Sequence, residues 1–258
     1  MVELSVLMPL YKTKYISWLA FESLIRQKDI DFEWELIVIE ENTEEFTGKN
    51  KVESYKNKLS EVGCVKLTYI PLNKWISLST KYFLLSAICD INSLLWTIAV
   101  GDYYSAPNRL KICYDSFIEH GWDFYRTKRL IYYNIHSGKL AERRISDRGS
   151  CCKAVRINIA KQVYYPEDRV RGLDGHFYRQ CKIVKPDLVE FVEPNDYWRF
   201  GLNTHGFNNL STNRGAKIDN LTNMFESSNL CLKDVLPIDI VQRIDTSKLN
   251  LSKHREGL

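Results

Sequence analysis

Acidic side chains follow two apolar runs in the first half of the sequence. Glu40 and Glu41 come directly after residues 34–39, and Asp102 comes shortly after residues 94–100. An acid at the end of a buried strand has two interpretations. It belongs to a polar turn, or it lies at the mouth of a parallel sheet and holds a metal ion and a phosphate.

Four strand-like apolar runs alternate with segments of helical periodicity. We expect strands at residues 4–10, 34–39, 65–70 and 94–100, and helices at residues 16–27, 44–59, 78–88 and 108–120. This alternation predicts βαβ crossovers and a mostly parallel mixed sheet with helices on both faces, which is an α/β fold. Ligands of such sheets bind outside the carboxyl ends of the strands. Those ends carry Pro9-Leu10-Tyr11, Glu40-Glu41-Asn42 and Gly101-Asp102.

The pattern is looser in the second half of the chain. We expect strands at residues 122–126 and 130–135, helices near residues 154–162, 176–182 and 230–240, loop between residue 199 and the last helix, and a loosely held tail from Asp245.

Composition excludes several classes of protein. The 258 residues carry a formal net charge of only +4, with both signs interspersed, so charge gives little support for nucleic-acid binding. No Gly-rich phosphate loop follows the first strand, which argues against a dinucleotide-dependent oxidoreductase and a P-loop kinase. No Gly-x-Ser-x-Gly elbow is present, which argues against an α/β-hydrolase. The seven cysteines lack the spacing of a zinc site, and their odd number is more typical of reduced thiols than of a disulfide framework. With no signal-peptide pattern and no apolar run long enough to span a membrane, we expect a cytoplasmic protein.

A resemblance to a known family is carried by three spaced motifs near the N-terminus. The first strand ends in Pro9-Leu10-Tyr11, the following helix carries Ser23-Leu24-Ile25-Arg26-Gln27, and the second strand reads Glu35-Leu36-Ile37-Val38-Ile39-Glu40-Glu41-Asn42-Thr43. In this order and spacing they resemble the opening of family 2-type, GT-A fold inverting glycosyltransferases. The resemblance implies a nucleotide-sugar-binding half at residues 1–121, an acceptor-side half at 122–215, and a C-terminal helix and tail at 216–258.

The resemblance assigns roles to the acidic strand ends. Pro9, Leu10 and Tyr11 would frame the base of a nucleoside diphosphate donor, most simply UDP, and Glu40 or Glu41 would hold the base or the ribose. The family's acidic motif after the fourth strand is reduced here to Gly101-Asp102, so Asp102 is the expected ligand of Mn²⁺ or Mg²⁺.

The family also implies residues further along the chain. The stretch "RGLDGHFYRQ" supplies Asp174 as the expected base that deprotonates the acceptor hydroxyl, with Arg179 five residues later. His176 is a weaker candidate, because a spacing of two residues on a helix points it away from Asp174. A loose match around "WRFGLNTH" makes His205 a possible metal or phosphate contact and Arg199 its charge partner.

Several assignments stay open from the sequence alone. Lys74 and Lys81 could neutralise phosphate or be ordinary solvated lysines. Four tyrosines, Tyr103, Tyr104, Tyr132 and Tyr133, could stack on a sugar or base or lie in the core. The basic cluster Arg143, Arg144 and Arg148 could face solvent, an anionic acceptor or a membrane surface. The expected partners are a nucleotide-sugar donor and a hydroxyl acceptor on a glycan or similar molecule. The alternatives are a non-catalytic nucleotide-sugar-binding protein and a nucleotidyltransferase.

Overall fold

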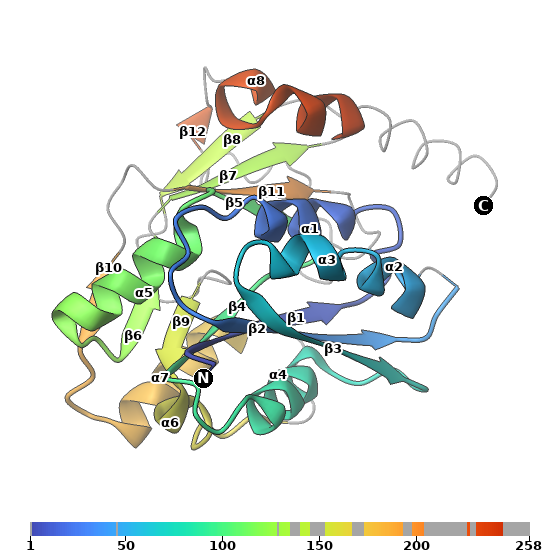
Figure 1. The fold of residues 1–258 in the computed structure, drawn as a ribbon. Helices are drawn as coiled ribbons and strands as arrows, with labels where there is room; N and C mark the ends of the chain where they lie inside the picture. Colours follow the sequence, from blue (N-terminus) through green and yellow to red (C-terminus); the bar gives the residue numbers. More distant parts are fainter. Residues whose placement is uncertain are drawn as a thin grey trace.

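The computed structural model describes residues 2–44, 46–127, 129–134, 140–144, 153–166, 173–192, 198–203, 226–227 and 231–244. Within these residues two sheets and several helices form stacked layers (Figure 1).

The larger sheet has seven strands in the order β10-β6-β9-β4-β1-β2-β3. Its strands are β1 (Leu4–Leu10), β2 (Trp34–Glu41), β3 (Cys64–Leu72), β4 (Leu95–Ile98), β6 (Phe124–Arg126), β9 (Lys153–Arg156) and β10 (Glu190–Val192). β9 runs antiparallel to both of its neighbours, and the other pairs in this sheet are parallel. The carboxyl ends of β1, β2, β3, β4 and β6 therefore meet at one edge, together with the start of β9.

Helices cover both faces of this sheet. On one face, α1 (Trp18–Ile25), α2 (Lys49–Glu53), α3 (Lys56–Ser60) and α5 (Arg109–His120) bury an apolar core that includes Leu4, Leu36 and Phe21. On the other face, α4 (Leu78–Ile88), α6 (Ile157–Ala160) and α7 (Leu173–Val184) bury a second core around Trp96 and Phe177. The continuous apolar character of β1 and β2 follows from this burial on both sides.

A second sheet of five strands has the order β12-β8-β7-β11-β5. It consists of β5 (Tyr103–Ser105), β7 (Arg129–Asn134), β8 (Leu140–Arg144), β11 (Trp198–Asn203) and β12 (Glu226–Ser227). A third core joins α1, β5 and β7 to the C-terminal segment, which comprises α8 (Leu232–Val235) and helical residues 238–244. Figure 1 shows α8 on the outer side of this sheet.

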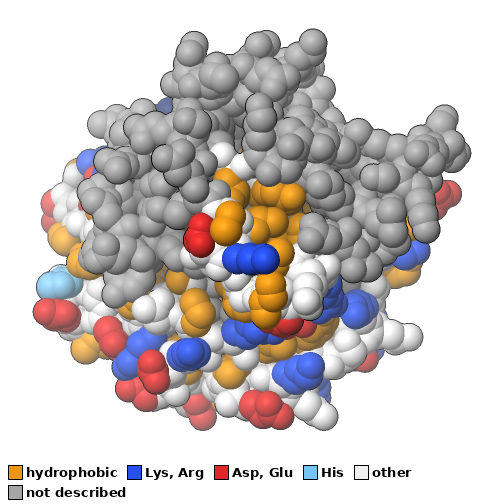
Figure 2. Space-filling view, turned by 90° about the horizontal axis from the view of Figure 1, so that it is seen from above, with side chains coloured by type: hydrophobic (Ala, Val, Ile, Leu, Met, Phe, Trp, Pro, Cys, Tyr) orange, Lys and Arg blue, Asp and Glu red, His pale blue; other side chains and the backbone are white. Residues whose placement is uncertain are grey.

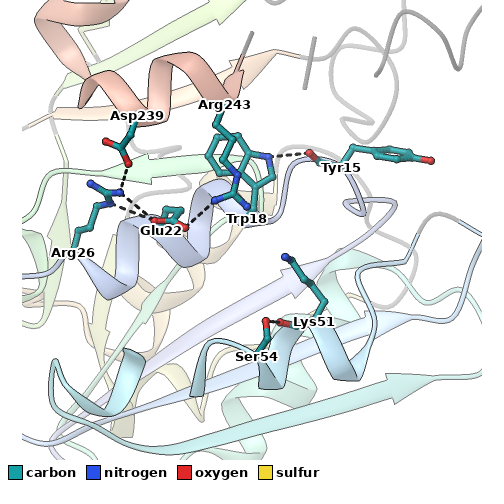
Figure 3. Close-up of polar contacts among 8 residues, drawn as sticks. All are labelled: Tyr15, Trp18, Glu22, Arg26, Lys51, Ser54, Asp239 and Arg243. Atoms are coloured by element: carbon teal, nitrogen blue, oxygen red, sulfur yellow. Dashed lines mark hydrogen bonds and ion pairs between the residues drawn. The ribbon is translucent and has the colours of Figure 1, made fainter. Parts of the chain in front are cut away.

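Ion pairs fasten the C-terminal segment to α1 (Figure 3). Arg243 pairs with Glu22 at 2.9 Å, and its guanidinium lies 4.2 Å from the ring centroid of Trp18. Arg26 pairs with both Glu22 and Asp239. Helix α1 and the helical residues 238–244 are therefore neighbours.

Most elements expected from the sequence are confirmed, and three expectations are wrong. The expected helix at residues 154–162 begins instead as strand β9, because residues 153–156 complete the sheet between β4 and β6. The single helix expected at residues 44–59 is two short helices, separated at Ser54 and Tyr55, where the Tyr55 ring stacks on Phe21. Residues 199–203, expected in a loop, belong instead to strand β11, which pairs with β5 and β7.

Basic and acidic side chains are interspersed around a central hydrophobic area on the described part of the face in Figure 2. Of the helices that the structure describes, none has both the length and the apolar character needed to cross a membrane.

Candidate functional site

The expected site residues gather at the carboxyl edge of the larger sheet. Leu10 is in register with Glu40 in the parallel β1–β2 pair, and the Ala99 N–H donates to the Leu7 carbonyl at 2.9 Å. The loops after β1, β2 and β4 therefore leave the sheet side by side. They carry Tyr11, Asn42 and Asp102.

Glu40 is fully buried, and its carboxylate holds the loop that follows β2. It accepts hydrogen bonds from the backbone N–H groups of Thr47 at 2.7 Å and Gly48 at 3.0 Å, and from the Tyr69 hydroxyl at 3.1 Å. Burial and the neighbouring Glu40 charge raise the pKa of Tyr69, which stays a hydrogen-bond donor. The Thr13 hydroxyl adds a contact at 3.5 Å and links to Thr47 at 3.1 Å. Glu40 thus holds the backbone of residues 47 and 48, in the loop that follows β2, against the carboxyl end of the sheet.

Glu41 forms a buried ion pair with Lys81 of α4. The Lys81 ammonium donates to the Glu41 carboxylate and to the Leu10 carbonyl, the latter at 2.7 Å. The side chains of Lys81 and Glu41 are 4% and 1% exposed. Burial lowers the pKa of Lys81, and Glu41 opposes that shift. The pair therefore joins the ends of β1 and β2 to α4.

Lys81→Met should destabilise the protein strongly, because it leaves the Glu41 carboxylate buried without its counter-charge. We expect the free energy of unfolding to fall by about 3–5 kcal/mol in urea titrations. The double variant Lys81→Met/Glu41→Gln should recover much of this loss, giving a large coupling energy in a double-mutant cycle.

The control for this cycle is Lys49→Met, which removes an exposed lysine that pairs with Glu53 at 3.5 Å. Its effect should stay below about 1 kcal/mol. Equal effects of Lys81→Met and Lys49→Met would contradict a structural role for the buried pair.

Asp102 lies at the end of the β4 loop and is 6% exposed. The residue before it, Gly101, occupies a place where side chains do not fit. A Cβ atom on Gly101 would lie 2.5 Å from Leu10 Cδ2 and 3.3 Å from Thr13 Cγ2, and Leu10 itself is fully buried. The close approach of these two loops explains why one acid stands here rather than two.

Gly101→Ala should therefore lower the free energy of unfolding by about 1–3 kcal/mol, the usual cost of overpacking. Gly175→Ala is the matched control, because nothing lies within 4 Å of the Cβ position at Gly175 in α7. It should raise stability by roughly 0.5–1 kcal/mol, as alanine is the better helix former. A neutral result for Gly101→Ala in thermal and urea unfolding would contradict the steric argument.

Other expected residues take varied positions around the edge. Tyr11 is half-buried, with the Lys81 ammonium 5.4 Å from its ring centroid, and Pro9 is buried within β1. Lys12 has a φ of 52°, a left-handed conformation unusual for a side chain-bearing residue and a frequent mark of functional loops. Lys74 is exposed in the loop before α4.

The tyrosines whose side chains are described belong to the core. Tyr104 is 1% exposed and Tyr133 is 5% exposed, and both pack in the third core with the C-terminal segment. Burial raises the pKa of Tyr104 to about 12, against the opposing charge of Arg26. Tyr103 is 7% exposed, and the side chain of Tyr132 lies outside the description.

Asp174 lies in the first turn of α7, whose backbone the structure describes; its side chain lies outside the description. The His176 Nε2–H donates a hydrogen bond to the Tyr164 carbonyl at 3.2 Å. His205 and Arg148 fall outside the described residues, and Arg143, Arg144 and Arg199 are described only as backbone in β8 and β11.

Three buried residues at the edge were not identified from the sequence. Thr13 contacts both Glu40 and the Gly101 loop, and Arg109 is 2% exposed, donating to Thr97 at 2.6 Å. Lys153 is 1% exposed at the start of β9. No local motif predicts their burial, which depends on contacts between distant parts of the chain.

The described residues do not form an all-protein metal cage. Among them, no group of three or more His, Cys, Asp and Glu side chains could hold an ion. One carboxylate still suits Mn²⁺ or Mg²⁺, because such ions usually keep water and phosphate oxygens as their other ligands. Asp102 at the mouth of the sheet fits that kind of shared site.

Known structures share this architecture, although the sequence itself matches no protein-family model and no curated protein. Residues 1–349 of S. aureus TarS, crystallised with UDP-GlcNAc, align with a TM-score of 0.62 and 16% identity over 97% of this chain and 72% of that one. The longer TarS chain aligns with the same score and identity over 80% of this chain, which spans 38% of that chain.

A second similar structure is the mannosyltransferase PcManGT from Pyrobaculum calidifontis, in complex with GDP-Man and Mn²⁺. It aligns with a TM-score of 0.54 and 11% identity over 78% of this chain and 56% of that one. Together with the mixed, mostly parallel sheet flanked by helices, these alignments show that the chain has the GT-A fold. Among proteins of this fold, its architecture is similar to that of TarS.

Proposed function

We propose that the protein is a glycosyltransferase that moves a sugar from a uridine diphosphate donor to a hydroxyl group of an acceptor, with inversion at the anomeric carbon. The observation that carries this proposal is Asp102, buried at the carboxyl edge of a GT-A sheet beside the ends of β1 and β2. Similar structures were crystallised with UDP, UDP-GlcNAc and GDP-Man, which supports a nucleotide-sugar donor.

The carboxylates of Glu40 and Glu41, at the end of β2, already accept hydrogen bonds from the chain itself, and this supports uracil as the base of the donor. Guanine offers adjacent N–H donors that a free carboxylate accepts together, whereas uracil offers a single N–H between two carbonyl groups. Glu40 and Glu41 are both engaged by groups of the chain itself. They therefore act as positioning residues, and the base is framed by Pro9, Leu10 and Tyr11.

The chemistry is assigned to the two candidate acids. Asp102 would hold a divalent cation, which when bound would offset the charge that develops on the departing diphosphate. Asp174 accepts the proton of the acceptor hydroxyl. The hydroxyl oxygen forms a bond to the anomeric carbon of the sugar while the bond between that carbon and the diphosphate breaks. Exposed Lys74 is available to phosphate, while Lys81 is committed to Glu41. His205 is proposed as an additional metal or phosphate contact.

A thermal-shift panel tests the proposal with purified protein. UDP should raise the melting temperature only when Mn²⁺ or Mg²⁺ is present, GDP should raise it less, and a hydrolysis screen over UDP-sugars should identify a donor. Stabilisation by nucleoside triphosphates alone would instead indicate a nucleotidyltransferase. A lack of response to every nucleotide would overturn the proposal.

A further inference from the structure

Helix α4 exposes apolar side chains on its outer side. Phe83 is 53% exposed, and Ala87 and Ile88 are exposed as well. Phe83 and Ala87 are four residues apart, so they lie on the same face of the helix. Ile91, in the turn after α4, is 84% exposed. The outer side of α4 is therefore apolar.

This surface differs from the outer side of an ordinary amphipathic helix, which carries charged and polar residues. The charged residue of α4 is Lys81, and it is buried against Glu41. On the opposite side of the larger sheet, α5 exposes Asp115 and Glu119. Apolar side chains gathered at a protein surface indicate contact with another molecule or with a membrane.

Helices α6 and α7 continue the same layer. The ring centroid of Tyr165, just after α6, lies 6.3 Å from that of Phe83, and the neighbouring Tyr164 is exposed. Ile183 is exposed on α7. Figure 1 shows α4, α6 and α7 on one side of the larger sheet. We call their outer surface the α4–α7 face, and its exposed apolar residues are Phe83, Ala87, Ile88, Ile91, Tyr164 and Ile183.

The charged side chains described on the α4–α7 face are mostly basic. Lys161 and Arg179 are exposed, and Lys182 is half-exposed and pairs with Glu190 at 3.3 Å. Burial raises the pKa of the Cys89 thiol, just after α4, to about 12, and the nearby charge of Lys161 opposes this rise. Lys161 therefore lies close to the end of α4.

Acidic residues are scarce in these three helices. The sequences of α4 and α6 contain none, and that of α7 contains Asp174 in its first turn. Asp90, in the loop after α4, is half-buried, and its carboxylate accepts a hydrogen bond from the Asn92 N–H at 2.8 Å. On the other side of the sheet, α1, α2 and α5 each carry at least one acid. The described part of the α4–α7 face thus combines apolar side chains with an excess of positive charge.

We propose that the α4–α7 face binds the surface of a lipid bilayer that contains anionic lipids. The apolar side chains enter the boundary between headgroups and acyl chains, and the lysine and arginine side chains pair with lipid phosphates. A second copy of the chain fits this face less well, because a twofold contact places the same patch against itself and brings like charges together. A bilayer on this side of the larger sheet leaves its carboxyl edge open to a donor.

Vesicle sedimentation with the full chain tests the apolar part of this contact. The protein should sediment with vesicles of equal parts phosphatidylcholine and phosphatidylglycerol, and much less with phosphatidylcholine alone. Ile91→Ser should weaken binding to the anionic vesicles on the order of tenfold, because an apolar side chain no longer leaves water. Ile118→Ser is the matched control, since Ile118 is 62% exposed on α5, on the opposite side of the sheet.

Lys161→Gln tests the electrostatic part. It should weaken binding to the anionic vesicles about fivefold and leave binding to phosphatidylcholine unchanged. Lys49→Gln, which removes an exposed lysine of α2, is the control and should bind like the wild type. Added salt should release the wild-type protein from the anionic vesicles, because it screens the attraction between lysine and phosphate.

Ile91→Ser should keep the wild-type melting temperature, because the side chain of Ile91 is exposed. Wild-type protein that stays in the supernatant with anionic vesicles would overturn the proposal. Sedimentation of both Ile91→Ser and Lys161→Gln at the wild-type level would also overturn it. A wild-type dimer in light scattering that Ile91→Ser converts to a monomer would show that a second copy covers this face instead of a bilayer.

Discussion

Asp102→Asn is expected to abolish sugar transfer while leaving the protein folded. The substitution keeps the size and shape of the side chain but removes the negative charge that a divalent cation requires. Lewis-acid stabilisation is worth several kcal/mol and each 1.4 kcal/mol is tenfold in rate, so kcat should fall at least about 100-fold. With Gly101 next to it, no second acid at the neighbouring position compensates.

The measurement pairs donor turnover with the thermal response to UDP. In Asp102→Asn, Mn²⁺ should no longer increase the stabilisation by UDP, and the melting temperature without ligand should stay near that of the wild type. Asp115→Asn is the control, since this acid is half-exposed on α5 and pairs with Lys111 at the surface. Full turnover by Asp102→Asn would remove Asp102 from the mechanism.

Asp174→Asn is expected to stop transfer by a different route. An amide cannot accept the proton of the acceptor hydroxyl, and general-base catalysis typically contributes about 10²- to 10⁴-fold. The variant should therefore lose that factor in kcat while still binding UDP with its normal dependence on Mn²⁺. Asp102→Asn and Asp174→Asn thus differ in their metal response even though both lose activity.

Single-turnover kinetics with bound donor provide the measurement for Asp174→Asn. Asp187→Asn, an exposed acid just after α7, is the matched control and should retain the wild-type rate. If Asp174→Asn keeps the wild-type rate, another residue is the base, and His176 would be tested next.

The first half of the fold was predictable because its signals are local. The apolar run at residues 4–10 and the helix at residues 78–88 coincide with β1 and α4, since burial on both faces leaves a continuous apolar strand and helical periodicity marks the covering helix. The acids at the strand ends were placed at one edge correctly, because parallel strands share their direction.

The remaining features depend on contacts between distant residues. β9 pairs with strands about 30 and 60 positions earlier in the chain, so four residues of weak local preference became a strand. The ion pair of Glu41 with Lys81 spans 40 positions, and the steric limit at Gly101 comes from Leu10. Sequence patterns reveal which residue types are present but not which of them are already engaged with each other.

The fastening of the C-terminal segment to α1 has a consequence for how the chain reaches its native state. Arg243 and Glu22 are 221 positions apart, so their contact closes a loop of nearly the whole chain. Such contacts raise the contact order and slow folding, because the chain loses loop-closure entropy before the contact contributes any favourable free energy. During synthesis, Trp18 and Leu19 stay without their C-terminal partners until residues 235–244 have emerged from the ribosome, so the third core forms later than the contacts within the first half of the chain.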